Sequence, residues 1–179
     1  KWMWETPCLN NTHMFKINFK KTLLDSIIIS VIFLTDRFSK IYILKIAELQ
    51  NAVDIYLTPY LNFYLIWNKG IAFGLLSINE NFIYNLITLI IASITLVVLV
   101  MAVKTEGLKK YALLCVFGGS LGNLFDRIYY SAVPDFIDFH INNFHWFVFN
   151  VADIFITLGI IFLIFKEIFT YNEKNEKIN

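Results

Sequence analysis

The chain has 179 residues, which suits one domain, and 58% of them are hydrophobic whereas only 16% are charged. A typical soluble domain has about 45–50% apolar and about 25% charged residues, so the composition excludes an ordinary soluble protein and predicts an integral membrane protein. The net charge of +1 gives no reason to expect nucleic acid as a partner. The two cysteines, Cys8 and Cys115, lie in unlike surroundings and fit neither a disulfide framework nor a metal site.

Four apolar segments approach the length of about 20 residues that a transmembrane helix requires. They cover, roughly, residues 22–44, 82–103, 111–125 and 148–165. Asp126 and Arg127 end the third segment early. The first is predicted to be a retained span, because no small-residue cleavage site follows it. The pattern predicts an all-α integral membrane fold, built as a bundle of four transmembrane helices.

Lysine and arginine residues in the short loops predict how these spans are oriented. Lysines concentrate in the N-terminal flank, in the short link 104–110 and in the C-terminal tail, whereas two long loops contain few. Both termini are therefore expected in the cytoplasm, and the long loops, about 45–81 and 127–147, on the outer side. The predicted organisation is a cytoplasmic tail (1–21), a membrane domain (22–169) and a second cytoplasmic tail (170–179). Residues 1–13 differ from the rest and are interpreted as a disordered or non-native segment.

The two outer loops contain segments typical of short strands. Residues 56–67 and 136–149 are rich in aromatic and β-branched side chains, and the Asn-Asn pair at 142–143 predicts a turn within the second segment. His140 and His145 fall in this alternating segment at a spacing that predicts opposite faces of a strand. We therefore expect surface histidines there rather than a metal site.

Charged residues within the spans are costly, by about 2.5–3.5 kcal/mol each on insertion scales, so each is expected to have a partner or a function. Asp36 and Lys40 have the i,i+4 spacing that places them on one helix face as an ion pair. Arg37 is predicted on a different face. The pair either anchors the membrane edge or braces a functional site.

The third span ends in small and polar residues. Gly118 and Gly122 have the GxxxG spacing that allows a neighbouring helix to approach closely. Asn123 and Arg127 are separated by i,i+4, and Asp126 follows Asn123 at i,i+3, so these polar side chains share one side of the helix. A close helix contact and a polar face are thus predicted together at the outer end of this span.

The fourth span begins with an isolated carboxyl group. Asp153 is followed by no charged residue before Lys166, and Asn150 is placed to donate a hydrogen bond to it. Asp135 and Asp138 in the preceding loop are both candidates to approach Asp153. Two carboxyl groups within hydrogen-bond reach share one proton, so the ionised member activates water while the protonated member polarises a carbonyl. This is the aspartic-protease arrangement, and it requires no metal or cofactor.

Four sequence blocks, taken in order, resemble one family. They are D-R-F-S-K at 36–40, N-K-G-I-A-F-G at 68–74, G-G-S-L-G-N-L-F-D-R at 118–127 followed by Asp135, and F-N-V-A-D at 149–153. Over about residues 22–169 the chain resembles the lipoprotein signal peptidases, also called type II signal peptidases. The resemblance implies an aspartic endopeptidase of the bacterial inner membrane, with an extracytoplasmic β-cradle over its site, and we expect the chain to act as a monomer. Its substrates are prolipoproteins that carry diacylglyceryl-cysteine, and it cuts just before that cysteine.

The same resemblance implies roles for individual residues. Asp135 and Asp153 form the catalytic dyad, and no metal or cofactor takes part. The residues that line or support the site are Asp36, Lys40, Asn68, Gly70, Gly122, Asn123, Asp126, Arg127, Asn150 and Ala152. Asp126 is expected to hold Arg127. Pro134 departs from the pattern, because the family usually has valine there, and proline fixes φ and removes a backbone donor.

Two other classes of function compete with this interpretation. A small proton-coupled transporter or channel component would use Asp36, Asp126 and Asp153 as proton carriers, but such proteins often contain repeats, and this sequence has none. A membrane phosphotransferase would gather Asp126, Asp135 and Asp138 around a metal ion, and its activity would depend on that metal. A purely structural membrane protein explains neither Asp153 nor the polar end of the third span.

Overall fold

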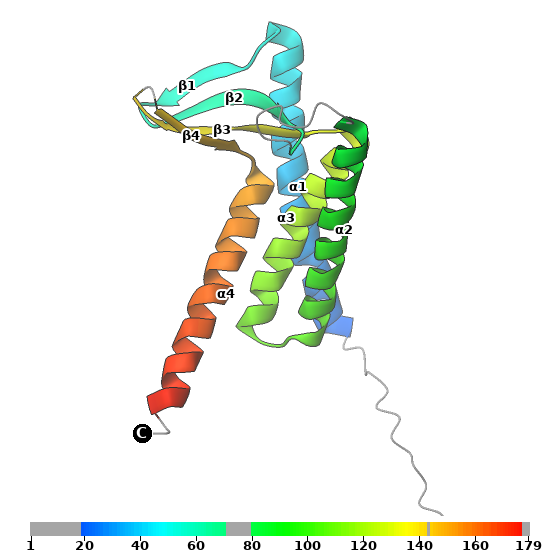
Figure 1. The fold of residues 1–179 in the computed structure, drawn as a ribbon, viewed down its shortest axis with the longest axis vertical. Coiled ribbons are helices and arrows are strands. Elements are labelled where there is room, and N and C mark those ends of the chain that lie inside the picture. The colour runs from blue at the N-terminus through cyan, green and yellow to red at the C-terminus, as the bar shows by residue number, and fades with distance from the viewer. Residues whose placement is uncertain (1–18, 71–79, 143, 177–179) are drawn as a thin grey trace, which may run out of the picture.

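A computed structural model describes residues 19–70, 80–142 and 144–176 of the chain (Figure 1). In chain order the elements are α1 (Phe19–Gln50), β1 (Asp54–Thr58), β2 (Leu61–Asn68), α2 (Glu80–Lys104), α3 (Leu108–Tyr130), β3 (Val133–Ile141), β4 (Phe144–Phe149) and α4 (Val151–Glu176). The predictions for residues 1–13, and for the part of the 68–74 block beyond Gly70, fall outside the described residues.

The four helices coincide with the four predicted spans, and each is longer than the apolar segment that predicted it. Among the described helices, α2 over Asn81–Lys104 is the one long and apolar enough to cross a membrane by composition alone. The other three carry more charged side chains, some of them buried inside the bundle. The prediction of four helices is therefore confirmed, and four membrane crossings stay a prediction.

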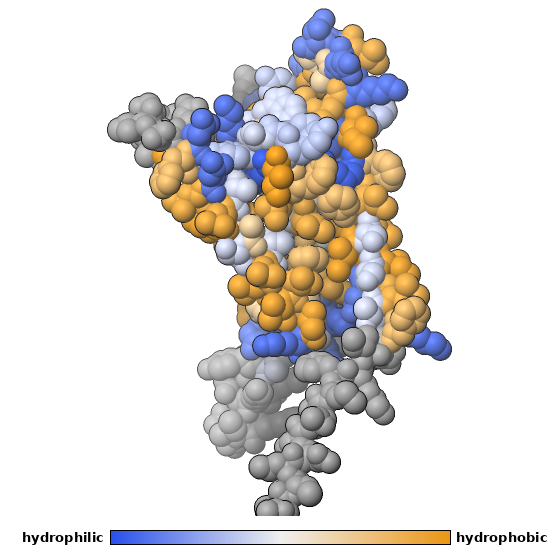
Figure 2. All heavy atoms as spheres, turned by 90° about the vertical axis from the view of Figure 1, so that its right-hand side faces the viewer, coloured by the Kyte–Doolittle hydropathy of each residue, from blue (hydrophilic) through white to orange (hydrophobic). Residues whose placement is uncertain are grey.

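Apolar side chains cover the outside of the bundle, while charged side chains occupy part of its interior. Figure 2 shows hydrophobic residues gathered over the helical part of the molecule. On α2, Leu89, Leu96 and Val103 are 61–63% exposed, whereas Asp36 and Lys40 of α1 are fully buried. A large apolar surface of this kind is stable where lipid rather than water surrounds it. The arrangement is therefore that of a membrane protein.

Helix α3 lies at the centre of the bundle and packs against α1, α2 and α4. A Cβ atom on Gly118 would lie 3.1 Å from a side chain of α1, and one on Gly119 would lie 2.5 Å from the backbone oxygen of Ala152 in α4. A Cβ atom on Gly122 would lie 2.7 Å from Asp36 Oδ2. The predicted close helix contact at the GxxxG spacing is confirmed, and it brings the polar residues of three helices together.

The strands form one antiparallel sheet in the order β1-β2-β3-β4, which lies across one end of the bundle (Figure 1). A small apolar core of Ile43, Val53 and Phe136 attaches the sheet to α1. The strands predicted in both outer loops are confirmed, although α1 continues to Gln50 and shortens the first loop. The all-α description therefore covers the bundle alone, since a four-stranded sheet completes the fold.

The strand geometry around Pro134 is intact. Pro134 lies in β3 opposite Trp67 of β2, and the pairing continues on both sides of it. Strand β4 pairs with β3 only from Ile137 onward, so β3 has one neighbouring strand at the proline. Prolines within sheets are confined to edges of this kind, because a residue without an N–H cannot donate to strands on both sides. Asp135, next to it, pairs with Ile66 of β2, and the register shifts by one residue between this pair and the pair of Ile137 with Phe63.

The prediction that His140 and His145 lie on opposite faces of a strand is wrong. The two residues lie on adjacent strands, β3 and β4, and pair directly with each other. Their rings stack with centroids 5.2 Å apart, and His140 is buried while His145 is exposed. The chain reverses between them at Asn142, whose φ of 53° confirms the predicted turn, while residue 143 falls outside the described part.

Candidate active site

Asp135 projects from β3 into a set of amide donors. Its Oδ1 accepts a hydrogen bond of 2.6 Å from Asn150 Nδ2, and its Oδ2 accepts one of 2.9 Å from Asn68 Nδ2. The residue is 3% exposed. Burial raises the pKa of Asp135 to about 6, against the opposing effect of the two amide hydrogen bonds. This carboxyl group therefore exchanges its proton close to neutral pH.

Asp153 lies in the first turn of α4, where the helix dipole favours a negative charge. Its Oδ1 accepts a hydrogen bond of 2.8 Å from Asn123 Nδ2, and its Oδ2 accepts one of 3.1 Å from the backbone N–H of Asn150. In return, Asn150 Oδ1 accepts from the backbone N–H of Asp153 at 3.1 Å and so caps the helix. Asn150 thus contacts both aspartates, through its amide group on one side and its backbone on the other. The predicted hydrogen bond from Asn150 to Asp153 is confirmed.

The two aspartates line one cavity of about 210 Å³. The polar part of its wall is completed by Asn68, Asn123, Arg127 and Asn150, together with Ser120. Ile91 of α2 and Ile156 of α4 supply an apolar side. The cavity therefore combines two carboxyl groups, several amide donors and an apolar wall, which suits a peptide held at the edge of a lipid phase.

A buried cluster of charged side chains lies next to the cavity and consists of Asp36, Arg37, Lys40 and Asp126. Lys40 Nζ donates to Asp36 Oδ2 at 2.8 Å, to Asp126 Oδ2 at 2.6 Å and to Asn123 Oδ1 at 2.9 Å. Lys40 is fully buried, as are both aspartates. Asn123 also donates to Asp153 of α4. Lys40 therefore holds the side-chain amide of Asn123 in the orientation that this hydrogen bond needs. The predicted Asp36–Lys40 ion pair is confirmed, and it belongs to the site.

Two sequence predictions about this cluster are wrong. Arg37 was expected on a different face, yet its guanidinium pairs with Asp36 at 3.3 Å and also with Asp126. Asp126 was expected to hold Arg127, yet its partners are Lys40 and Arg37. The close α1–α3 contact explains both results, because it brings Asp126 within reach of two cations on the neighbouring helix. The cluster is neutral overall, with two cations and two anions.

Arg127 instead lines the cavity. Its Nη1 donates a long hydrogen bond of 3.4 Å to the backbone oxygen of Lys69. A Cβ atom on Gly70 would lie 2.9 Å from Arg127 Nη2, and the φ of +74° at Gly70 also favours glycine. The guanidinium carbon lies 5.8 Å from the centre of the Tyr84 ring, and the Tyr84 hydroxyl donates to the backbone oxygen of Arg127 at 2.8 Å.

The remaining supporting residues are also in contact with this site. The backbone N–H of Ala152 donates to Asp36 Oδ1 at 3.0 Å, and its fully buried methyl group leaves little room for a larger side chain. Asn68 Oδ1 accepts from the backbone N–H of Gly70 at 2.7 Å, which orients its amide toward Asp135. Every predicted site residue is thus placed at the cavity or in the cluster that supports it.

Within the helices, sequence reasoning missed Ile91, Ser120 and Ile156, which line the cavity, and Tyr84, which contacts Arg127. They lie in apolar spans, where an isolated tyrosine, isoleucine or serine has no distinctive spacing. The metal cluster that a phosphotransferase requires is not formed by Asp126, Asp135 and Asp138. Asp126 pairs with cations, and Asp138 lines a different cavity from Asp135.

The fold and the site define a membrane enzyme, and comparisons with known proteins agree. A solved bacterial membrane enzyme, determined by the in meso method at 1.9 Å resolution, matches with a TM-score of 0.63 and 25% identity, over 80% of this chain and 91% of that one. A second such structure at 2.3 Å resolution has a TM-score of 0.64 and 24% identity, over 84% of this chain and 91% of that one. The second likeness concerns the fold alone.

The family model described as signal peptidase (SPase) II matches residues 28–169. A protein of Pelagibacter ubique named lipoprotein signal peptidase is 54% identical over 92% of this chain and 99% of its own length. One of the same name from Anaplasma phagocytophilum is 36% identical over 83% of this chain and 94% of its own length. The chain belongs to the signal peptidase II family and is a membrane peptidase.

Proposed function

We propose that this protein is an aspartic endopeptidase that removes the signal peptide from diacylglyceryl-modified prolipoproteins. The observation that carries the proposal is the single cavity lined by Asp135 and Asp153, with Asn150 bound to both. The relatives named lipoprotein signal peptidase point to the substrate class. The cut falls just before the lipidated cysteine, and the enzyme acts as a monomer without a metal or cofactor in its reaction.

The proposed reaction uses one proton shared by the two carboxyl groups. The ionised carboxylate takes a proton from water as the water oxygen bonds to the scissile carbonyl carbon. The protonated carboxyl group donates its hydrogen bond to the carbonyl oxygen. The tetrahedral intermediate then collapses, the C–N bond breaks, and a proton passes to the leaving amine of the cysteine. The raised pKa of Asp135, about 6, keeps this proton available near neutral pH.

The polar residues around the dyad have supporting roles in this proposal. Asn68, Asn123 and Asn150 hold the carboxyl groups in place, since each donates to one of them. Arg127 faces the same cavity and binds a carbonyl oxygen of the substrate chain. The apolar wall at Ile91 faces the signal peptide, whose helix stays in the bilayer.

The proposed location is the bacterial cytoplasmic membrane, with both termini in the cytoplasm. The sheet and the cavity lie at the outer side, where a translocated prolipoprotein exposes its cleavage site. This orientation rests on the lysines of the short link after α2 and of the two terminal segments. The lipid chains of the substrate remain in the membrane throughout, so the partners are the prolipoprotein and lipid, with no role for nucleic acid.

Cleavage of a diacylglyceryl-modified precursor by the purified protein tests the proposal. Asp135→Asn and Asp153→Asn should each abolish cleavage while membrane insertion is retained. Asp25→Asn is the matched control, because Asp25 pairs with Lys110 away from the cavity, and it should cleave normally. Precursor processing by either dyad variant at a rate near that of the wild type would refute the assignment.

A further inference from the structure

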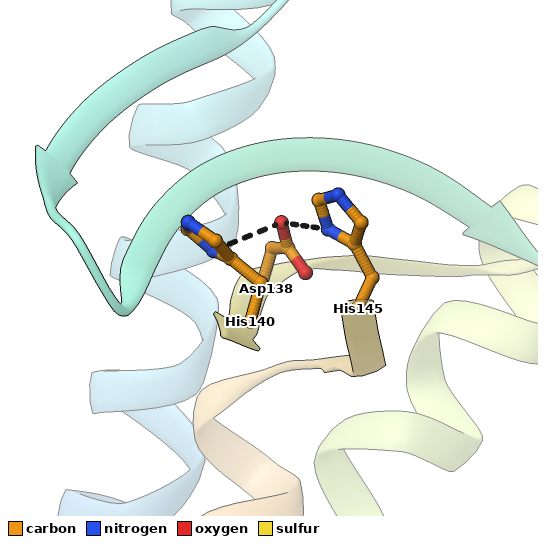
Figure 3. A group of neighbouring side chains, drawn as sticks. All are labelled: Asp138, His140 and His145. Atoms are coloured by element: carbon orange, nitrogen blue, oxygen red, sulfur yellow. Dashed lines mark hydrogen bonds and ion pairs between the residues drawn. The ribbon is translucent and has the colours of Figure 1, made fainter. Parts of the chain in front are cut away.

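Three side chains of the kind that bind metal ions lie close together at the β3–β4 hairpin, outside the catalytic cavity. Figure 3 shows Asp138, His140 and His145 turned toward one another. Asp138 Oδ2 lies 2.7 Å from His145 Nδ1 and 3.6 Å from His140 Nδ1. One ligand atom from each residue falls within 4.8 Å of the others. Two imidazole nitrogens and one carboxylate oxygen therefore surround a single point.

A β-bulge creates this arrangement. Along most of the hairpin the partners keep one register, for example Asp138 with Val148 and Phe139 with Phe147. The register then shifts by one residue, so that His140 pairs with His145 and Trp146 has no partner residue on β3. Because side chains alternate between the two faces of a strand, this shift moves His145 to the face of Asp138 and His140.

Buried polar atoms without hydrogen-bond partners also favour cation binding here. Among the described residues, Asp138 Oδ1, His140 Nδ1 and Asn62 Oδ1 are buried and form no hydrogen bond. Asp138 itself is only 2% exposed, and Asn62 lies directly opposite it on β2. Each such atom costs about 1–3 kcal/mol when unsatisfied. Carboxylate and amide oxygens offer lone pairs, as does a neutral imidazole nitrogen, so a cation would satisfy them where another acceptor would not.

The cluster has its own access route. Asp138 and His145 line a cavity of about 420 Å³ together with Asn62 and Tyr64. This cavity is distinct from the one that contains Asp135 and Asp153. Asp135 and Asp138 lie three residues apart on β3, a separation of about 10 Å along an extended strand. An ion in the hairpin would therefore lie outside the reach of the catalytic carboxyl groups.

We propose that Asp138, His140 and His145 form a binding site for a divalent transition metal, with Zn²⁺ as the best match to the ligands. Zinc binds imidazole nitrogen at about 2.0–2.1 Å and carboxylate oxygen at about 2.0–2.2 Å, so tetrahedral ligands lie roughly 3.3 Å apart. The two carboxylate–imidazole spacings, 2.7 and 3.6 Å, bracket this value, and the metal would replace the hydrogen bond between Asp138 and His145. Water from the cavity, or Asn62 Oδ1, completes the coordination. The metal joins β3 to β4 and stiffens the strand that carries Asp135.

The experiment is a titration of the purified full chain, without a polyhistidine tag, with Zn²⁺ and separately with Co²⁺. The site predicts one metal per chain, d–d absorption of bound Co²⁺, and a melting temperature that rises with Zn²⁺. His145→Gln and Asp138→Asn should weaken binding by about ten-fold or more. His145 is exposed, so its variant keeps the fold and remains informative.

Two controls separate this site from others. His13→Gln removes the third histidine of the chain and should bind metal as the wild type does. Asp135→Asn should also retain binding, because the dyad is not a ligand. The proposal is overturned if micromolar Zn²⁺ gives no stoichiometric binding, if His145→Gln binds as tightly as the wild type, or if either control variant loses the metal.

Discussion

The buried carboxyl group of Asp135 should make the protein less stable at neutral pH than at mildly acidic pH. Its folded pKa is raised from 3.8 to about 6, so the folded state binds more protons than the unfolded state between these values. Stability contributed by the protonated form is present below the unfolded pKa and is lost as the pH rises through about 6. A shift of about two pKa units corresponds to roughly 3 kcal/mol of destabilisation at pH 7.

Asp135→Asn removes this ionisation and should therefore change the pH dependence of stability. Asn150 and Asn68 both donate to the carboxylate, and an asparagine offers only one acceptor oxygen, so one hydrogen bond of about 1 kcal/mol is lost at every pH. Between pH 4.5 and pH 7.5 the wild type should lose about 2 kcal/mol relative to the variant, since about 1.4 kcal/mol is lost per pH unit up to pH 6.

The assay is thermal unfolding of both proteins in detergent at a series of pH values. The melting temperature of the variant minus that of the wild type should increase by several degrees from pH 4.5 to pH 7.5. Other titrating groups cancel in this difference, because both proteins contain them. If the melting temperatures of the two proteins change in parallel with pH, burial does not raise the pKa of Asp135 and the prediction is refuted.

Three further predictions concern activity and the supporting cluster. Cleavage of the precursor should fall as the pH is raised through about 6, the raised pKa of Asp135, because the dyad then loses the proton that polarises the scissile carbonyl; a rate that keeps rising between pH 6 and pH 8 would contradict this. Lys40→Met should cost about 3–5 kcal/mol in thermal unfolding, since it leaves Asp36 and Asp126 buried with one cation fewer, and adding Asp126→Asn should recover part of the loss. Gly122→Ala should destabilise by about 1–3 kcal/mol in the same assay, because the new Cβ would lie 2.7 Å from Asp36 Oδ2. Unchanged melting of Gly122→Ala would show that the helices separate easily there.

Several features could be read from the sequence because they depend on local spacing. The four helices follow from apolar runs whose length is set by the bilayer. The Asp36–Lys40 pair follows from the i,i+4 geometry of one helix, and the close approach at Gly122 follows from the absence of a side chain. The capping contact between Asn150 and Asp153 follows in the same way, since it lies within one turn of chain.

Contacts between distant segments were decided by the tertiary structure. The hydrogen bond from Ala152 to Asp36 joins residues 116 positions apart, and Lys40 reaches Asp126 over 86 positions. Helix periodicity states which face a side chain occupies, but it does not state which helix lies opposite. The face of Arg37 and the partner of Asp126 were therefore mispredicted, because Asp126 meets two cations of the neighbouring helix.

Composition and residue spacing were enough to predict the membrane character, the positions of the helices and the polar residues available for chemistry, because both act locally. That Asp135 and Asp153 line one cavity depends on the three-dimensional fold, because helix packing and strand pairing place them there. The fold also decided the face on which His145 lies, since a one-residue shift in strand register reverses every side chain beyond it. No pattern within β4 alone contains that information, because the register is a property of two strands.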